Sequence, residues 1–151
     1  MKLWATLYGM VWLVFLQLLI TMDPRPPSWF IYIHAPLGLA IILLAYANYR
    51  QARATEAPAR IKRTVRATLA LSILMAFLGV LLWANLGTSW SILLGYSFWD
   101  LVHIFHGVNA LAIIAQAAAA ASAYDMWEEK EFEQRTAIGE IPPPPRPTPS
   151  R

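Results

Sequence analysis

The chain contains no cysteine. This absence excludes disulfide bonds, iron–sulfur clusters held by thiolates and haem attached covalently through thioether bonds. Any metal or cofactor must therefore be held by other side chains, and histidine is the most informative of them. The 151 residues include only three histidines: His34, His103 and His106.

Charged residues are also scarce. They make up 14% of the chain, against about 25% in soluble domains. Four stretches contain no Asp, Glu, Lys or Arg, and each could cross a bilayer as a helix of about 20 residues: 3–22, 26–49, 67–99 and 101–124. We therefore predict an all-α integral membrane four-helix bundle, with helices near residues 3–22, 29–49, 67–86 and 100–123.

The remaining charges predict the orientation of these helices. Segment 50–66 contains six basic residues and one acid, whereas Arg25 is the only basic residue between the first two helices. Because basic loops tend to stay in the cytoplasm, we predict a plasma-membrane protein with segment 50–66 and both termini in the cytoplasm. The net charge of +3 comes from this segment, so it indicates a lipid bilayer as partner and no nucleic acid.

The end of the chain differs from the rest. The acidic stretch YDMWEEKEFEQR (124–135) is predicted to continue the fourth helix into the cytoplasm. The final segment IPPPPRPTPSR (141–151) cannot be helical, because proline lacks the backbone donor and clashes with the preceding turn. We therefore divide the chain into a membrane domain, residues 1–124, and a cytoplasmic part, residues 125–151, with an acidic helix extension and a disordered proline-rich tail.

A short repeat selects two of the three histidines. HAPLGLAII begins at His34, and HGVNALAII begins at His106. Both contain histidine, three residues, a small residue and then Leu-Ala-Ile-Ile. The small residues are Gly38 and Ala110. The repeat indicates two similar helical hairpins, in which helices one and two correspond to helices three and four.

The predicted topology places the two histidines at one depth. Helices two and four run in the same direction, and His34 and His106 each lie roughly 7–9 Å below the outer ends at about 1.5 Å per residue. Gly38 and Ala110 share the histidine faces, which leaves a flat slot beside each imidazole. Haem iron takes two axial imidazoles, and bundle cores commonly hold cofactors. We therefore predict haem b bound in residues 1–124, with His34 and His106 as iron ligands.

His103 lies one turn nearer the surface than His106. Three roles remain open for it: a hydrogen bond to a haem propionate, proton exchange at a quinol, or a place at the headgroup boundary. Three alternatives to haem also remain open. They are a hydrogen bond between helices, a quinone or proton-relay site, and a copper or zinc site made by Asp100, His103 and His106.

Other polar residues in the spans have simpler interpretations. Asn109, one turn past His106, is predicted to support the histidine site. Gln17 and Gln116 are predicted to form hydrogen bonds between helices. Arg25 and Trp99 are predicted to lie near the haem propionates at the outer surface.

These segments resemble one four-helix half of the heme A synthase family. FHGVNALAII (105–114) is similar to the fourth-helix signature of the family's cofactor-haem half. IHAPLGLAIILLAY (33–46) is similar to its second-helix histidine stretch, and LALSILMAFLGVLL (69–82) to its third-helix Leu-Gly-Val segment. The resemblance covers residues 1–124, and it implies a four-helix fold with b-type haem between histidines of the second and fourth helices.

The chain departs from this family at three points. The family commonly has arginine after the second-helix histidine, and here the residue is Ala35. The catalytic half has glutamate three residues before that histidine, and here the residue is Ile31. The cysteine pair of the outer loop is absent. The resemblance therefore implies the fold and the b-type haem for this chain more strongly than it implies the oxidation of a haem methyl group.

Three functions follow from these observations. The first is a bis-histidine cytochrome that transfers electrons, linked to a quinone or to a respiratory complex as a subunit or homo-oligomer. The second is a compact heme A synthase-like enzyme that oxidises haem O to haem A, as a homodimer that rebuilds the eight-helix arrangement. The third is a structural membrane subunit without haem. We expect the first.

Overall fold

The computed structural model of the protein describes residues 3–21, 27, 29–85, 91–93 and 95–140. This part of the chain contains four helices, each long and apolar enough to cross a membrane: α1 (Leu3–Ile20), α2 (Phe30–Ala54), α3 (Ala59–Trp83) and α4 (Phe98–Ala137). The protein is therefore a multi-pass helical membrane protein, as its charge-free stretches predict.

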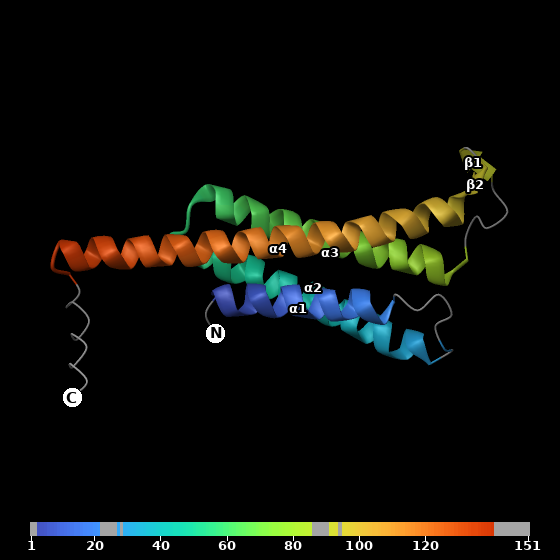
Figure 1. Ribbon diagram of the computed structural model, residues 1–151, viewed down its shortest axis with the longest axis horizontal. Coiled ribbons are helices and arrows are strands. Elements are labelled where there is room, and N and C mark those ends of the chain that lie inside the picture. The colour runs from blue at the N-terminus through green and yellow to red at the C-terminus, as the bar shows by residue number, and fades with distance from the viewer. Residues whose placement is uncertain (1–2, 22–26, 28, 86–90, 94, 141–151) are drawn as a thin grey trace, which may run out of the picture.

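The four helices form an elongated bundle (Figure 1). Helix α1 packs on α2 and α4, and α3 also packs on α2 and α4. Consecutive helices run in opposite directions. As a result, α2 and α4 are parallel and occupy opposite corners of the bundle. Side chains of these two helices can meet across its centre.

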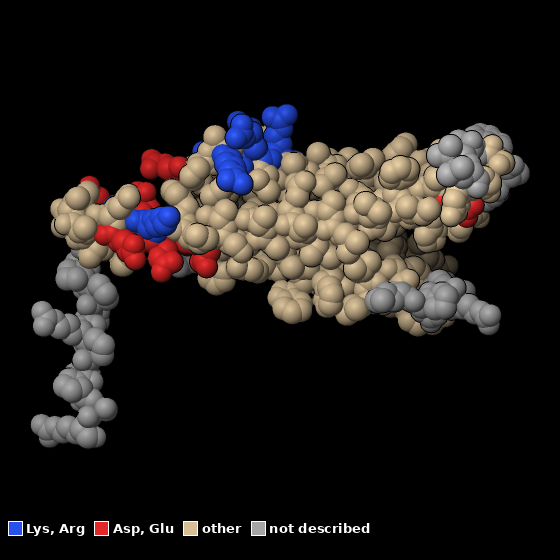
Figure 2. Space-filling view, turned by 45° about the horizontal axis from the view of Figure 1, so that its top comes forward, with Lys and Arg blue, Asp and Glu red and all other residues tan. Residues whose placement is uncertain are grey.

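The two ends of the bundle differ in chemistry. One end, which we name the basic end, contains the α2–α3 turn (Thr55–Pro58) and the start of α1. At the other, the hairpin end, two short antiparallel strands precede α4: β1 (Ser91–Leu93) and β2 (Tyr96–Ser97). Figure 2 shows most charged side chains gathered at the basic end and along the extension of α4, an uncharged surface along the bundle, and an acidic group at the hairpin end.

Two clusters of buried apolar residues form the core. The first lies at the basic end and consists of Leu3, Leu7, Ala52, Ala57, Ile61, Val65, Ala120, Ala121 and Tyr124. The second lies further along the bundle and consists of Met10, Val14, Ile41, Ala45, Ile113 and Ala117. The alanines of α4 allow its backbone to approach its neighbours closely. Beyond the second cluster, toward the hairpin end, the bundle contains His34 and His106.

The predicted boundaries of α2 and α3 were wrong on the side of the basic turn. The loop expected at residues 50–66 consists only of Thr55–Pro58, because α2 continues to Ala54 and α3 already begins at Ala59. Absence of charge marks the part of a helix that lies in hydrocarbon, and it does not mark where the helix ends. Arginine, lysine and alanine favour helix in water as well. All six basic residues of segment 50–66 therefore lie on helical turns.

The strands at residues 91–97 were not predicted. Gly95 has a φ of +84°, a conformation that glycine adopts without steric cost, and it precedes β2. Ser97 then caps α4. Its hydroxyl accepts from the Asp100 N–H at 3.1 Å, and the Asp100 carboxylate accepts from the Ser97 N–H at 2.9 Å. This capping box sets the start of α4 two turns before His106.

Helix α4 is 40 residues long and includes the whole acidic stretch that follows Tyr124. It projects beyond the other helices at the basic end (Figure 1). The proline-rich segment 141–151 and Arg25 lie outside the described residues.

Candidate functional site

His34 on α2 and His106 on α4 face each other across the bundle. Their ring centres lie 6.1 Å apart, and the ring planes are inclined by 46°. Both residues are partly buried. The Nδ1 atom of each ring is buried and has no hydrogen-bond partner. The structure therefore brings together the two histidines that the repeat selects.

This spacing fits a metal held between two imidazoles. A metal lies about 2 Å from each ligating nitrogen, and the nitrogen lies about 1 Å from its ring centre, so the ring centres lie about 6 Å apart. The observed 6.1 Å matches this value. An unpaired buried nitrogen is unfavourable, and coordination of a metal removes that cost. Two neutral imidazoles are a donor set that haem iron accepts.

Helix α1 and the first turn of α2 hold His34 in place. The Phe30 ring, one turn earlier, stacks on the imidazole with 4.9 Å between ring centres and 28° between planes. Gln17 donates from Nε2 to the backbone carbonyl of His34 at 2.8 Å. This bond confirms the prediction that Gln17 forms a hydrogen bond between helices. It joins α1 to α2, and its acceptor belongs to His34.

Gly38 does not simply provide an open slot beside His34. A Cβ atom built at Gly38 would lie 3.8 Å from the Nε2 atom of Gln17, the nearest neighbouring atom. The space beside this glycine is therefore bordered by the amide of α1. Its counterpart in the repeat, Ala110, is 6% exposed and lies one turn past His106.

Helix α3 approaches His106 through a glycine. A Cβ atom built at Gly79 would lie 3.4 Å from Cε1 of His106. The backbone carbonyl of Met75 also contacts the His106 imidazole, and backbone carbonyls commonly orient metal-ligating histidines in this way. Sequence analysis noted Gly79 only as part of the Leu-Gly-Val segment and assigned it no role at the histidine site. The available signal was that it is the only glycine of the third apolar stretch before the loop.

Asn109 joins α3 and α4 through a hydrogen bond from its side chain. It is buried, and its Nδ2 atom donates to the backbone carbonyl of Leu71 at 2.9 Å. It therefore holds α3 against α4 one turn from the histidine. The Oε1 atom of Gln116 is buried without a hydrogen-bond partner, so the contact predicted for that residue is not made by this atom.

His103 is exposed and lies one turn nearer the hairpin end. Its ring packs on Trp99, with 4.9 Å between ring centres. The alternative metal site is not formed, because the described residues contain no group of three His, Cys, Asp or Glu side chains that could hold a metal. Asp100 caps α4 instead of facing His103 and His106 as a third ligand.

No family model matches the chain, and no curated protein or solved structure matches it. The resemblance to one half of the heme A synthase family rests on the short histidine and Leu-Gly-Val segments.

Proposed function

We propose that this protein is a bis-histidine cytochrome of the plasma membrane that carries single electrons on haem b. The observation that carries the proposal is the His34–His106 pair, with 6.1 Å between ring centres and a buried, unpartnered nitrogen on each ring. When bound, haem supplies one-electron chemistry. His34 and His106 are the residues that would hold its iron.

The surrounding residues hold the two imidazoles in a fixed arrangement. Phe30 stacks on His34, and Gln17 anchors the backbone at that residue. The Met75 carbonyl and the close approach of Gly79 restrict His106. Rigid ligands support rapid electron transfer, because little of the protein has to rearrange when the charge changes.

Ligation by two histidines favours a carrier over an oxidising enzyme. If His34 and His106 both held the iron of haem b, they would occupy the positions that oxygen or a substrate would need. The proposed carrier then needs only contact with an electron donor and an electron acceptor. We propose a quinone or a subunit of a respiratory complex for these partners, with the protein present as a homo-oligomer or as one subunit of that complex.

The charges give the proposed orientation. With the basic end in the cytoplasm, both termini are cytoplasmic, and His34 and His106 lie nearer the outer surface. Electrons would then enter or leave near Trp99 and His103, which pack together at the hairpin end.

Haem content tests this proposal directly. The protein purified from haem-replete cells should give a pyridine haemochrome spectrum of haem b, and the reduced protein should show a sharp low-spin α-band. A colourless, folded preparation would contradict the proposal and favour a structural subunit. Haem O converted to haem A by the purified protein would instead identify the enzyme of the heme A synthase type.

A further inference from the structure

Two hollows lie between α3 and α4. The first, of about 250 Å³, lies at the basic end and is lined by Arg60, Ile61, Thr64, Ala119, Ala120 and Ala123. The second, of about 370 Å³, lies further along the bundle and is lined by Leu74, Leu78, Phe105, Val108, Asn109 and Ala112. The first contains a guanidinium group, whereas the second is almost entirely apolar.

Both hollows lie on the same side of the helix pair. On α3, Arg60 and Leu78 are 18 residues apart, which is five full turns at 3.6 residues per turn. On α4, Ala112 and Ala119 are seven residues apart, close to two turns. The side chains on this face of α4 are short, because alanines occupy positions 112, 115, 119 and 123. The two hollows are therefore successive parts of one seam.

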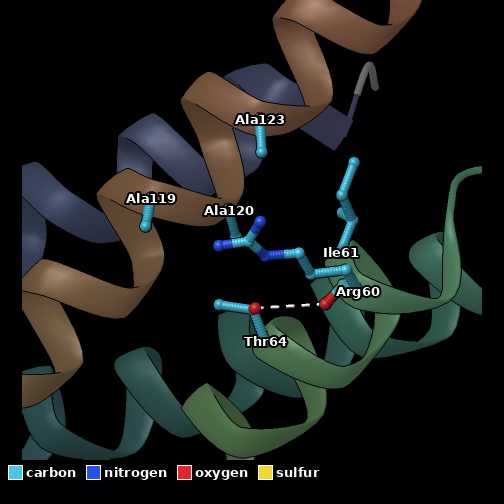
Figure 3. A pocket seen from close by; sticks show the side chains of 6 residues that line it. All are labelled: Arg60, Ile61, Thr64, Ala119, Ala120 and Ala123. Atoms are coloured by element: carbon cyan, nitrogen blue, oxygen red, sulfur yellow. Dashed lines mark hydrogen bonds between the residues drawn. The ribbon is translucent and has the colours of Figure 1, made fainter.

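Arg60 is the polar group of this seam. Its side chain reaches from α3 across to the alanines of α4 (Figure 3). Arg50 and Arg53 donate to the hydroxyls of Tyr46 and Tyr49. Within the described part of the chain, the Arg60 guanidinium has neither a hydrogen bond nor an ion pair. Its planar array of donors suits the oxygens of a phosphate group.

The seam crosses from the polar boundary into the hydrocarbon. Arg60 precedes the charge-free part of α3, whereas Ala119 and Ala123 belong to the charge-free part of α4. From Ala119 to the second hollow, the seam extends 7 residues to its near edge at Ala112 and 14 residues to its far edge at Phe105, or about 10–21 Å at about 1.5 Å per residue. One leaflet contributes about 15 Å of hydrocarbon, half of the bilayer core.

From this arrangement we infer that the α3–α4 seam binds one anionic phospholipid from the leaflet at the basic end. The lipid phosphate contacts the Arg60 guanidinium, and one acyl chain lies in the apolar hollow. Arg63, one turn along α3 from Arg60, adds positive charge near the headgroup. Basic pockets between membrane helices recognise anionic headgroups in this way. This inference does not depend on haem.

Native mass spectrometry of the full chain tests the site. The protein in detergent is mixed with equal amounts of phosphatidylglycerol and phosphatidylcholine. We expect selective retention of one phosphatidylglycerol, and a decrease of at least about fivefold in Arg60→Ala, the effect of one basic residue near an anionic surface. Ala119→Leu, which fills the first hollow without changing the charge, should lower retention similarly.

Two variants serve as matched controls. Arg66→Ala removes the same charge from an exposed position six residues along α3, on a different side of the helix. Ala70→Leu adds the same side chain at an exposed position of α3, one turn past Arg66 and outside the two hollows. Both should retain the lipid. If Arg60→Ala and Arg66→Ala lost phosphatidylglycerol equally, the lipid would be attracted by the overall charge and the proposed site would be wrong. If inorganic phosphate displaced the lipid, the ligand of Arg60 would be a free phosphate and the proposed lipid ligand would be wrong.

Discussion

At the scale of single residues, the two proposed ligands are held by different neighbours. His34 is held by an aromatic ring and by a hydrogen bond to its own carbonyl, whereas His106 lies against the backbone of α3. Each has a buried Nδ1 atom without a partner. A buried polar atom left unsatisfied costs about 1–3 kcal/mol. A bound metal would therefore stabilise the bundle as well as supply its chemistry.

Ligand substitution separates the three histidines. His34→Ala and His106→Ala should each abolish the low-spin spectrum, because the iron loses an axial imidazole. His103→Ala should retain haem, since its exposed ring packs on Trp99 and does not face His34. Absorption and electron paramagnetic resonance spectra of the purified variants measure this. If His103→Ala lost haem while His106→Ala kept a normal spectrum, the assignment would have to be reversed.

Gly79 offers a second test at this scale. A methyl group at Gly79 would lie 3.4 Å from Cε1 of His106, so Gly79→Ala should shift the imidazole slightly and change the electron paramagnetic resonance signal. Gly79→Val should displace the ring and lower haem occupancy several-fold. Gly107→Ala is the matched control, because a Cβ atom there meets nothing within 4 Å. Unchanged spectra in Gly79→Val would show that α3 does not position the ligand.

At the scale of helices, α4 links the histidine site to the basic end. Its 40 residues begin at the Ser97–Asp100 capping box and continue past the bundle to Ala137. Asn109 and the alanines of α4 hold α1 and α3 close along this length. The position of His106 therefore depends on where α4 begins and on how closely α3 packs against it.

Loss of the cap should weaken the start of α4. Ser97→Ala removes the side-chain acceptor for the Asp100 N–H, and loss of such a cap costs about 0.5–2 kcal/mol. Chemical unfolding followed by circular dichroism should show a correspondingly lower free energy of unfolding. Ser91→Ala, at an exposed position on β1, should leave it unchanged. Equal stability of the two variants would mean that the capping box contributes little.

At the scale of the whole molecule, the described basic residues are separated from the histidine site along the bundle axis. The basic turn lies at one end of the bundle (Figures 1 and 2). His34 and His106 lie within the first three turns of α2 and α4, toward the other end. An apolar core of two clusters separates them. Reagents that do not cross the membrane should therefore reach the two ends from opposite sides.

Single cysteines test this arrangement, and the cysteine-free chain provides the background. Ala59→Cys, at the exposed start of α3, should react with an impermeant maleimide only after the cytoplasmic side is opened. Ser91→Cys, exposed on β1, should react in intact cells. Labelling of both from the same side would contradict the proposed topology, in which α3 crosses the membrane between the two positions.

The amino-acid sequence alone determined the number of membrane helices and their approximate positions. Charge-free stretches predict membrane helices because transfer of a charge into hydrocarbon costs free energy, whatever the fold of the rest of the chain. The repeat also predicted that His34 and His106 lie at one level, because equal hairpins place equivalent residues at equal depth. Both inferences concern positions along the axis of the helix bundle. Such positions can be calculated from the number of residues that separate two points of the sequence.

Only the tertiary structure decided which side chains meet around that axis. It placed Gly79 against His106, directed Gln17 to the carbonyl of His34 and paired Asn109 with Leu71. It also extended α2 and α3 beyond the apolar stretches and formed the strands at residues 91–97. These features depend on how each helix is rotated and how closely it packs. Rotation and packing result from contacts between helices that are distant in the sequence, so no local pattern records them.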